Sequence, residues 1–339
     1  MSKGFTVLRA SLPSPPESWQ VFNVGQFLRD LGADWATFNL SIHAYALCIL
    51  AGILVGLTLT NRRMVARGAE PWVVLDVALI AIPLGIIGGR VYHVLTHPAD
   101  YFAGQDILRV FYIWEGGMAI FGALIFGAVG AYVGCRLVGL RFWAFADAIA
   151  PGLLIAQAIG RLGNWFNREL FGTPTDLPWG LEIESTNPAF PIGLQEGTLF
   201  HPTFLYEGLW NVLGALALLW LGRRVTLQWG KQFGLYLIWY GVGRIATETI
   251  RLDPSETILG IRVNVWGAIV AVALGLLIIV VQSMRHTGLE ASPYRAGKEW
   301  VQPEPKAVPN TFTKDELENP TPAPRKRKPA PAAPTKNKK

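Results

Sequence analysis

The chain has 339 residues, of which 51% are hydrophobic and 16% are charged, and it contains 13 Trp. Because a soluble domain usually carries about 25% charged residues, this composition excludes an ordinary soluble domain and indicates a polytopic membrane protein. The formal net charge is +6, but residues 290–339 alone hold eleven Lys and Arg against six Asp and Glu, so the basic balance does not indicate a nucleic-acid partner.

The N-terminal region precedes the first long apolar run. Residues 1–16 lack the apolar core of a cleavable signal peptide, so we expect the first membrane helix to direct insertion. Residues 17–35 place aromatic and charged residues at near-helical spacing, which fits either an interfacial amphipathic helix or an irregular arm outside the membrane. We assign residues 1–38 to an extracytoplasmic or interfacial N-terminal arm.

Seven apolar runs then follow, each close to the length of about 20 residues that crosses a bilayer as a helix. They predict an all-α polytopic membrane domain with seven transmembrane helices over residues 39–286. Cys48 and Cys135 lie inside these runs and are expected to be buried, inert thiols, and no metal-ligand spacing is present, so no metal or cofactor is expected. The runs are 40–60, 73–94, 116–135, 142–159, 204–221, 233–250 and 263–281.

The basic residues of the short connections fall on one side of the predicted membrane, after the first, third, fifth and seventh runs. That side is cytoplasmic by the positive-inside rule, so the N-terminus lies outside and the C-terminus inside. The acidic segment 162–203 then lies outside and forms a small extracytoplasmic head. Residues 287–339, rich in Pro, Ala and Lys, are expected to be a disordered cytoplasmic tail, either inert or attracted to anionic lipid.

Residues 160–170, reading GRLGNWFNREL, place several polar side chains where the fourth run leaves the bilayer. Polar groups at such depth are costly unless they bind something. With the predicted topology, polar side chains from all the other runs except the seventh also fall in the outer half of the membrane. These residues are Tyr45, Arg90, Glu115, Arg161, Asn164, Glu169, His201, Tyr206, Glu207, Tyr240, Arg244, Glu248 and Arg251.

Each of these residues alone has a plain structural explanation. Arg244 and Glu248 are an i, i+4 pair that neutralises itself, and Tyr45 and Tyr240 fit interfacial anchors. Together, however, four arginines at one bilayer level exceed what helix pairing needs, and they predict a bound anion. Arginine suits a phospholipid phosphate because its planar fork donates two parallel hydrogen bonds and keeps its charge on burial. The four are Arg90, Arg161, Arg244 and Arg251.

The stretch GRLGNWFNREL closely resembles the signature of bacterial phosphatidylglycerol:prolipoprotein diacylglyceryl transferases. The resemblance extends over about residues 40–284 and includes GGRVYHVL, WEGGMAIFGAL, HPTFLYEG and YGVGRIATETIR. It implies an enzyme of the bacterial plasma membrane whose site faces the extracytoplasmic leaflet. Such an enzyme transfers the diacylglyceryl group of phosphatidylglycerol to the lipobox cysteine thiol of a preprolipoprotein, forms a thioether and releases glycerol 1-phosphate.

The same resemblance implies roles for individual residues. The family's essential arginines correspond to Arg161 and Arg244, and its first-span tyrosine corresponds to Tyr45. Some members carry a histidine, often cast as the catalytic base, where this chain has Phe121. The remaining matched positions are Asn164, Glu169, Glu207, Tyr240, Glu248 and Arg251.

We therefore expect Arg161 and Arg244 to hold the phosphate and the leaving group, with Arg251 as a further contact. Glu207, His201 or a tyrosine is expected to accept the thiol proton. The predicted catalytic residues are Arg161, Arg244, Glu207 and Tyr45, and the predicted substrate-binding residues are Arg161, Asn164, Glu169, Tyr240, Arg244, Glu248, Arg251, Arg90 and His201. The expected partners are phosphatidylglycerol, a lipobox peptide and membrane lipids.

Two other functions remain open on the sequence alone. A transporter or channel for an anionic solute would carry polar groups along a route through the whole membrane. A membrane scaffold would act through the basic tail and would leave the intramembrane arginines without a purpose.

Overall fold

The computed structural model describes residues 11–102, 104 and 106–302. Long helices dominate it, joined by short helical turns and two-stranded sheets. The predicted tail from residue 303 onward and the first ten residues lie outside the described residues. The helices are α1 (Val24–Asp30), α2 (Ala44–Val65), α3 (Val73–Thr96), α4 (Ala99–Phe102), α5 (Ile120–Leu137), α6 (Phe142–Phe166), α7 (Thr203–Arg224), α8 (Lys231–Glu248) and α9 (Val263–Arg285).

Six of the described helices are long and apolar enough to cross a membrane, namely α2, α3, α5, α6, α7 and α9. The chain is therefore a mostly helical, polytopic membrane protein. The predicted run 233–250 does form a helix, α8, but this helix is not among the six, because its 18 residues include Lys231, Arg244 and Glu248. The number of membrane crossings thus depends on α8.

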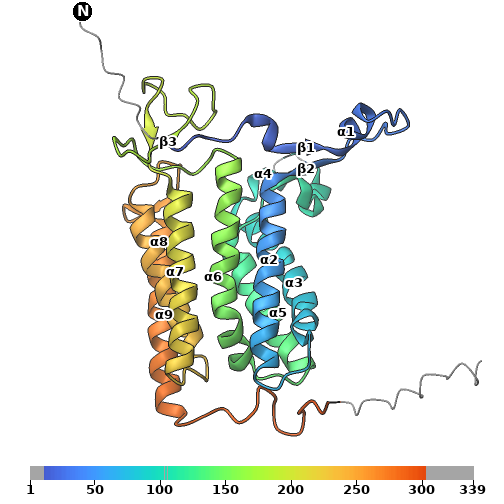
Figure 1. Ribbon diagram of the computed structural model, residues 1–339, viewed down its shortest axis with the longest axis vertical. Helices are drawn as coiled ribbons and strands as arrows, with labels where there is room; N and C mark the ends of the chain where they lie inside the picture. The colour runs from blue at the N-terminus through green and yellow to red at the C-terminus, as the bar shows by residue number, and fades with distance from the viewer. Residues whose placement is uncertain (1–10, 103, 105, 303–339) are drawn as a thin grey trace, which may run out of the picture. The chain divides into compact units, whose positions relative to one another are not determined.

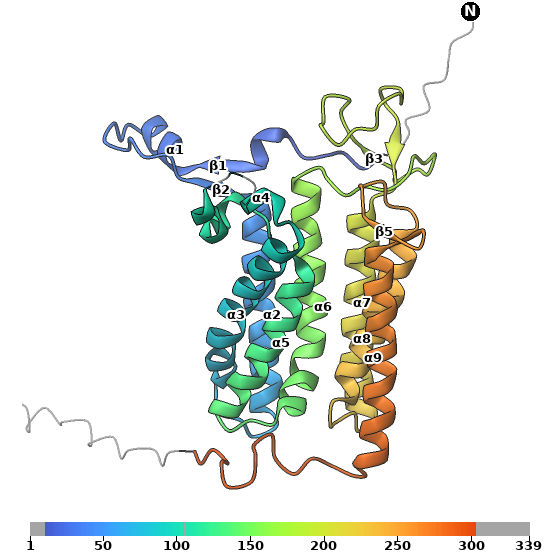
Figure 2. The same ribbon diagram turned by 180° about the vertical axis from the view of Figure 1, so that it is seen from behind.

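The helices gather in two groups that meet at α6. Helices α2, α3, α5 and α6 lie beside one another, and α7, α8 and α9 form a second group, with α6 in contact with both α7 and α8 (Figures 1 and 2). The predicted third run, 116–135, starts four residues before the corresponding helix. Helix α5 begins only at Ile120, because Gly116 and Gly117 have positive φ of 88° and 70°.

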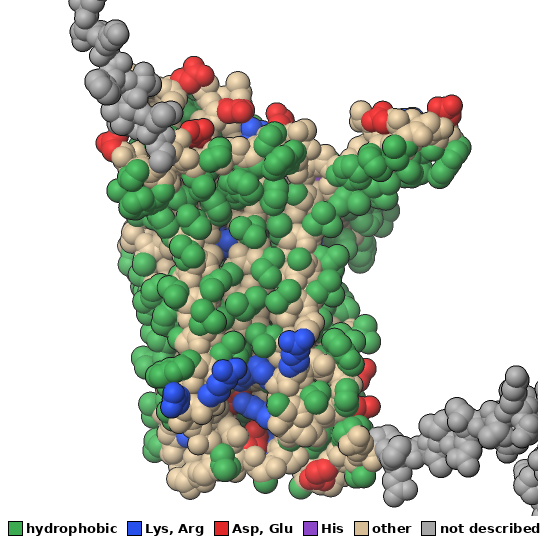
Figure 3. Space-filling model, viewed as in Figure 1, with side chains coloured by type: hydrophobic (Ala, Val, Ile, Leu, Met, Phe, Trp, Pro, Cys, Tyr) green, Lys and Arg blue, Asp and Glu red, His purple; other side chains and the backbone are tan. Residues whose placement is uncertain are grey.

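Small residues let the paired helices approach closely. A Cβ atom at Gly52 of α2 would lie 2.8 Å from the carbonyl oxygen of Ala156 in α6, and one at Gly234 of α8 would lie 2.8 Å from the carbonyl oxygen of Gly275 in α9. Lipid offers apolar side chains no preference for one another, so such close backbone contact is what holds membrane helices together. On the face drawn in Figure 3, hydrophobic side chains are frequent and charged ones are few between the two ends of the helices.

The start of α8 is fixed by a buried carboxylate. Asp147 of α6 is fully buried and accepts hydrogen bonds from the backbone N–H groups of Gly230, at 2.8 Å, and Phe233, at 3.0 Å. It thereby satisfies donors that the first turn of α8 leaves unpaired. This contact sets the register of α8 against α6, and so determines which α8 residues reach the other end of the helices.

The predicted N-terminal arm is irregular and strongly apolar on its surface. A 3-10 turn (Glu17–Trp19) leads to strand β1 (Val21–Asn23), which pairs antiparallel with β2 (Ser41–His43), and α1 lies between them. Asn23 caps α1 by accepting from the N–H of Gln26 at 2.9 Å. Trp19 and Trp35 are among its exposed aromatic side chains.

The segment between α6 and α7 packs around a small apolar cluster. Its strands β3 (Leu181–Glu182) and β4 (Leu199–Phe200) pair antiparallel, and Leu12 adds a bridge beside Leu181. The cluster consists of Phe171, Leu181, Ile183, Phe200 and Phe204.

The remaining short elements lie next to α5 and α9. Two 3-10 turns, η2 (Ile107–Phe111) and η3 (Ile113–Glu115), precede α5. Strand β5 (Thr257–Ile258) pairs with β6 (Ile261–Arg262) before α9.

Residues 286–300 run from the end of α9 to the opposite group of helices. Tyr294, which lies inside the predicted tail, is buried, and its hydroxyl accepts from the N–H of Glu70 at 3.0 Å. Arg141 donates to the carbonyl oxygen of Tyr294 at 2.7 Å, and the N–H of Arg295 donates to Gly139 at 2.8 Å. These contacts show that the chain stays packed beyond residue 287.

Candidate functional site

Three arginines from two helices and a loop converge on one carboxylate. Glu207, in the second turn of α7, has a largely buried side chain, and its Oε2 lies 2.5 Å from Nη2 of Arg161 in α6. Its Oε1 lies 3.3 Å from Nη1 of Arg244 in α8 and 3.5 Å from Nη1 of Arg251. One carboxylate therefore contacts three guanidinium groups at once and balances the charge of only one of them.

The chain direction explains why these residues meet. Arg161 lies near the end of α6 and Glu207 near the start of α7, so antiparallel packing brings them to the same end of the helices. Arg244 lies in the last turns of α8, which runs antiparallel to α7. This end also carries β3 and β4 (Figure 1).

A second carboxylate, Glu248, extends the network toward α9. Its side chain is fully buried, and it lies 2.9 Å from Nη2 of Arg244 and 3.0 Å from Nε of Arg262. Asn264 donates to Oε1 of Glu248 at 3.0 Å. The sequence analysis did not single out Arg262 or Asn264. The signal that could have found them is a charged and an amide residue at the outer boundary of the last apolar run.

Arg251 and Asp253 form the third part of the network. Nε of Arg251 donates to Oδ1 of Asp253 at 2.7 Å, and Nη2 of Arg262 lies 3.4 Å from Oδ2 of Asp253. Burial alone would lower the pKa of Arg251, but the hydrogen bond and charge of Asp253, together with the charges of Glu207 and Glu248, outweigh it and raise that pKa. For Asp253, burial acts to raise the pKa, while the bond to Arg251 holds it below its usual value.

The linked ion pairs carry an excess of positive charge. Among the described residues they join four arginines, Arg161, Arg244, Arg251 and Arg262, to three carboxylates, Glu207, Glu248 and Asp253. An uncompensated charge buried among helices is costly unless an anion completes it. Such a cluster of arginines is an arrangement that can hold an anion.

The signature stretch orients Arg161. Nη1 of Arg161 donates to Oδ1 of Asn164 at 3.2 Å, and Nδ2 of Asn164 donates to Oε1 of Glu169 at 3.0 Å. Asn167 adds a second donor to the same oxygen at 3.1 Å. Asn164 is buried, so this chain of hydrogen bonds fixes the direction of the Arg161 guanidinium.

The two predicted tyrosines lie near Arg161, and within the described part of the chain neither forms a hydrogen bond with Glu207. The ring of Tyr45 packs on α6 at Gly163, where a Cβ atom would lie 2.6 Å from its Cδ2. Tyr240 lies one turn before Arg244, interacts electrostatically with Arg161, and stacks on Tyr236 with ring centroids 6.3 Å apart.

His201 lies just before α7 and faces a different partner. Its Nδ1 is 3.1 Å from the hydroxyl of Tyr206, which also accepts from Nε1 of Trp179 at 3.0 Å. The hydroxyl of Tyr206 in α7 thus contacts both His201 and Trp179, which lie in the segment between α6 and α7.

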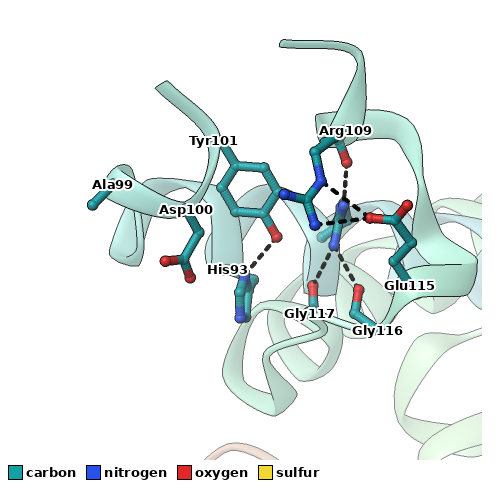
Figure 4. Close-up of a pocket in the computed structure, with 9 residues that line it drawn as sticks. His93, Ala99, Asp100, Tyr101, Arg109, Glu115, Gly116 and Gly117 are labelled. Carbon is teal, nitrogen blue, oxygen red and sulfur yellow. Dashed lines mark hydrogen bonds and ion pairs between the residues drawn. The ribbon is translucent and has the colours of Figure 1, made fainter. Parts of the chain in front are cut away.

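Arg90 belongs to a separate pocket of about 460 Å³ between α3, α4 and the turns before α5 (Figure 4). Its guanidinium donates to the carbonyl oxygens of Val110, at 2.8 Å, and Gly116, at 2.6 Å, and further to those of Arg109, Tyr112 and Gly117. Its donors are therefore directed at the backbone of this loop, whereas the other three predicted arginines meet at Glu207.

The other side chains of this pocket form local pairs. The hydroxyl of Tyr101 lies 3.0 Å from Nδ1 of His93, and Arg109 lies 3.2 Å from Glu115 (Figure 4). His93 also stacks on His97, with ring centroids 4.4 Å apart.

Phe121, at the position where some relatives carry histidine, bridges two helices. A Cβ atom at Gly267 of α9 would lie 2.9 Å from Cε1 of Phe121 in α5, and the Phe121 ring lies 6.5 Å from that of Tyr92 in α3. Its role here is apolar contact between α5 and α9.

The fold and the site define a polytopic membrane protein with a cluster of arginines and carboxylates contributed by several helices. The sequence pattern of the prolipoprotein diacylglyceryl transferase family matches residues 35–281. The chain belongs to this family.

Similar proteins agree with that assignment. The chain is 58% identical over 308 residues to a phosphatidylglycerol–prolipoprotein diacylglyceryl transferase of Leifsonia xyli subsp. xyli, covering 87% of each chain. It is 48% identical over 250 residues to transferase 2 of that name from Streptomyces coelicolor, covering 74% of this chain and 78% of the relative. It is 44% identical over 287 residues to the Bifidobacterium longum protein, covering 80% and 85%.

Proposed function

We propose that this chain transfers the diacylglyceryl group of phosphatidylglycerol to the cysteine thiol of a prolipoprotein. The products are a thioether-linked diacylglyceryl cysteine and glycerol 1-phosphate. The observation that carries the proposal is the convergence of Arg161, Arg244 and Arg251 on Glu207, within a network of four arginines and three carboxylates.

In this proposal the lipid phosphate enters the arginine cluster that Glu207 occupies. A phosphodiester presents two charged oxygens at about the spacing of a carboxylate, so it offers the same bidentate partner to Arg161 and Arg244. Binding of its single negative charge makes the network neutral. Glu207 then shares the arginines with the phosphate or is displaced by it.

The chemical step is attack of the cysteine sulfur on the diacylglyceryl carbon next to the phosphate oxygen. The S–C bond forms, the C–O bond breaks, and its electron pair stays on the departing glycerol phosphate. That group gains a negative charge during the step, and Arg161 and Arg244 are placed to stabilise the charge as it develops.

The thiol proton needs an acceptor, because an unperturbed thiol, with a pKa of about 8.5, is mostly protonated at neutral pH. We propose Glu207 for this role, since it is the carboxylate that contacts the arginines holding the phosphate. The proton finally resides on the released phosphate monoester.

We propose positioning roles for the other predicted residues. Asn164 and Glu169 aim Arg161, and Glu248 aims Arg244. Tyr45 and Tyr240 line the approach to these arginines. Arg90 holds the loop before α5 through its backbone carbonyl contacts, and His201 supports the segment between α6 and α7 through Tyr206.

We also propose that α8 crosses the membrane as a seventh span, because it packs between α7 and α9 and its charged side chains face the ion-pair network rather than lipid. The N-terminal arm and the head, residues 162–203, then lie on the extracytoplasmic side, with the arginine centre in the outer leaflet of a bacterial plasma membrane. The basic loops and the tail lie on the cytoplasmic side.

The test is a transfer assay with purified protein in phosphatidylglycerol vesicles and a lipobox peptide. Mass spectrometry should show a diacylglyceryl addition on the peptide cysteine, and Cys→Ser in the peptide should abolish it. Arg161→Ala and Arg244→Ala should each lower turnover by at least about 100-fold. If either variant folds and keeps normal turnover, the proposal that Arg161 and Arg244 bind the phosphate is wrong.

A further inference from the structure

A second arginine-lined hollow lies at the opposite end of the helices from Glu207. It has a volume of about 290 Å³ and is lined by Arg67, Gly222, Arg223, Arg224, Val225, Thr226, Leu227, Gln228 and Leu289. Lys and Arg side chains gather on this part of the surface (Figure 3). The proposed reaction uses none of these residues.

The polar groups that line this hollow are mainly hydrogen-bond donors. Arg223 and Arg224 are exposed, and neither forms an ion pair with a carboxylate among the described residues. Arg67 donates a hydrogen bond to the carbonyl oxygen of Ala144 at 3.3 Å and interacts electrostatically with Asp147 and Glu290, but forms no direct ion pair among the described residues. Oε1 of Gln228 accepts from the N–H of Glu290, which leaves the Gln228 NH₂ group to donate. Three guanidinium groups and an amide around one hollow, with no carboxylate in its described lining, suit a phosphate.

An apolar stripe leads from the hollow along α7. Leu209, Leu213, Leu216 and Trp220 are each more than half exposed, and they follow one another at intervals of four, three and four residues. Such spacing places them on one face of the helix, and Arg224 continues the same face one turn later. The stripe is long enough to contact acyl chains that lie parallel to α7.

We propose that this hollow and stripe bind an anionic phospholipid, with the phosphate among Arg67, Arg223 and Arg224 and the acyl chains along α7. The ligand chemistry is a phosphate ester, and the stripe indicates that it comes from a membrane lipid rather than from a soluble phosphate. The site lies at the opposite membrane boundary from the Arg161 centre, so it is distinct from the proposed substrate site.

The experiment uses the full chain in phosphatidylcholine vesicles with a small fraction of phosphatidic acid that carries a photoreactive acyl chain. After irradiation, mass spectrometry measures labelling of residues 209–228. We expect the phosphatidic acid probe to label this segment about tenfold more than a phosphatidylcholine probe with the same chain. A tenfold ratio of affinities is what one charged hydrogen bond provides. Equal labelling by the two probes would overturn the proposal.

Two matched double variants separate a defined site from general attraction. Arg223→Gln with Arg224→Gln should lower labelling to the phosphatidylcholine level. Arg62→Gln with Arg285→Gln removes the same charge from the last turns of α2 and α9, outside the hollow, and should leave labelling unchanged. An equal loss in both double variants would mean diffuse charge attraction, and no loss in the first would exclude these arginines.

Two further arms identify the ligand source and guard against misfolding. Glycerol 3-phosphate in excess should not reduce the labelling, and full competition by it would make the hollow a soluble-anion site instead. Thr226→Asp, at an exposed loop position, places a carboxylate at the hollow and should block labelling while peptide diacylglyceryl transfer continues. Unchanged labelling in this variant would place the lipid elsewhere.

Discussion

Nε of Arg262, the residue before α9, lies 3.0 Å from Oε1 of Glu248, the last residue of α8. Arg244 lies 2.9 Å from the other oxygen of the same carboxylate. Glu248 is thus shared between a predicted phosphate ligand and an arginine that no motif indicated. This sharing limits how strongly Glu248 holds Arg244, and it leaves Arg244 able to reach Glu207.

Arg262→Gln should therefore weaken transfer without removing any proposed substrate contact. With Arg262 neutral, Glu248 has Arg244 as its remaining ion-pair partner among the described residues and draws it away from the phosphate. We expect kcat/KM to fall by about tenfold, mainly through KM for phosphatidylglycerol, with Arg262→Lys recovering part of the loss. Arg285→Gln, at the far end of α9, is the matched control. A fall in kcat at constant KM would contradict the positioning role.

Glu207→Gln should separate lipid binding from chemistry. The amide no longer competes as an anion for Arg161, so lipid retention measured by native mass spectrometry should stay equal or rise. The same variant lacks the proposed proton acceptor, and turnover should fall by about 100-fold or more. Glu196→Gln, in the exposed part of the segment between α6 and α7, should change neither quantity. Loss of lipid binding together with turnover would indicate that Glu207 only organises the arginines.

Arg90→Lys should loosen the loop before α5. Lysine keeps the charge but cannot bond the carbonyl oxygens of Val110 and Gly116 together as the planar guanidinium does. Loss of one charged hydrogen bond corresponds to about tenfold faster exchange of the amides in residues 107–117. Hydrogen exchange measured by mass spectrometry checks this. Unchanged exchange with lost phosphatidylglycerol binding would instead support Arg90 as a substrate ligand.

The packing of residues 286–300 should depend on pH through Glu290. Burial raises the pKa of Glu290 to about 7, while Arg141 and Arg67 act to lower it and Asp147 to raise it. Because this folded-state pKa lies above the ordinary glutamate value of 4.5, the contribution of Glu290 to docking is fully present below about 4.5 and is lost as pH rises through about 7.

The rate of limited proteolysis after Arg295 should therefore increase between pH 6 and pH 8. The exchange rate of the Arg295 amide, corrected for the intrinsic pH dependence of exchange, should increase in the same range. Glu290→Gln should remove this dependence, whereas Glu299→Gln, an exposed neighbour, should retain it. A pH dependence that survives Glu290→Gln would assign the titration to another group.

The sequence predicted the helices well, because long apolar runs in a membrane leave the backbone few other ways to satisfy its hydrogen bonds. The run at 233–250 shows where composition becomes ambiguous. Two of the three charged side chains that make α8 too polar for a typical span, Arg244 and Glu248, belong to the candidate site. The convergence of Arg161 and Arg244 was expected from topology, and both do meet at Glu207.

Other features depended on contacts that no residue pattern encodes. The direction of Arg90 is set by a loop whose Gly116 and Gly117 adopt positive φ, and the sequence does not reveal which carbonyl groups this turns toward the guanidinium. Tyr294 lies in a Pro- and Ala-rich context that is typical of disorder, and its burial depends on the surface that Glu70 and Leu140 offer. No residue pattern singled out Arg262, which lies just before α9.

Residues 286–300 follow every long helix that the structure describes, yet they join the end of α9 to the turns beside α3 and α6. During synthesis these contacts can form only after α9 has left the ribosome. A chain stalled before residue 293 would therefore carry all nine described α-helices but would lack the contacts of residues 294 and 295 with those turns.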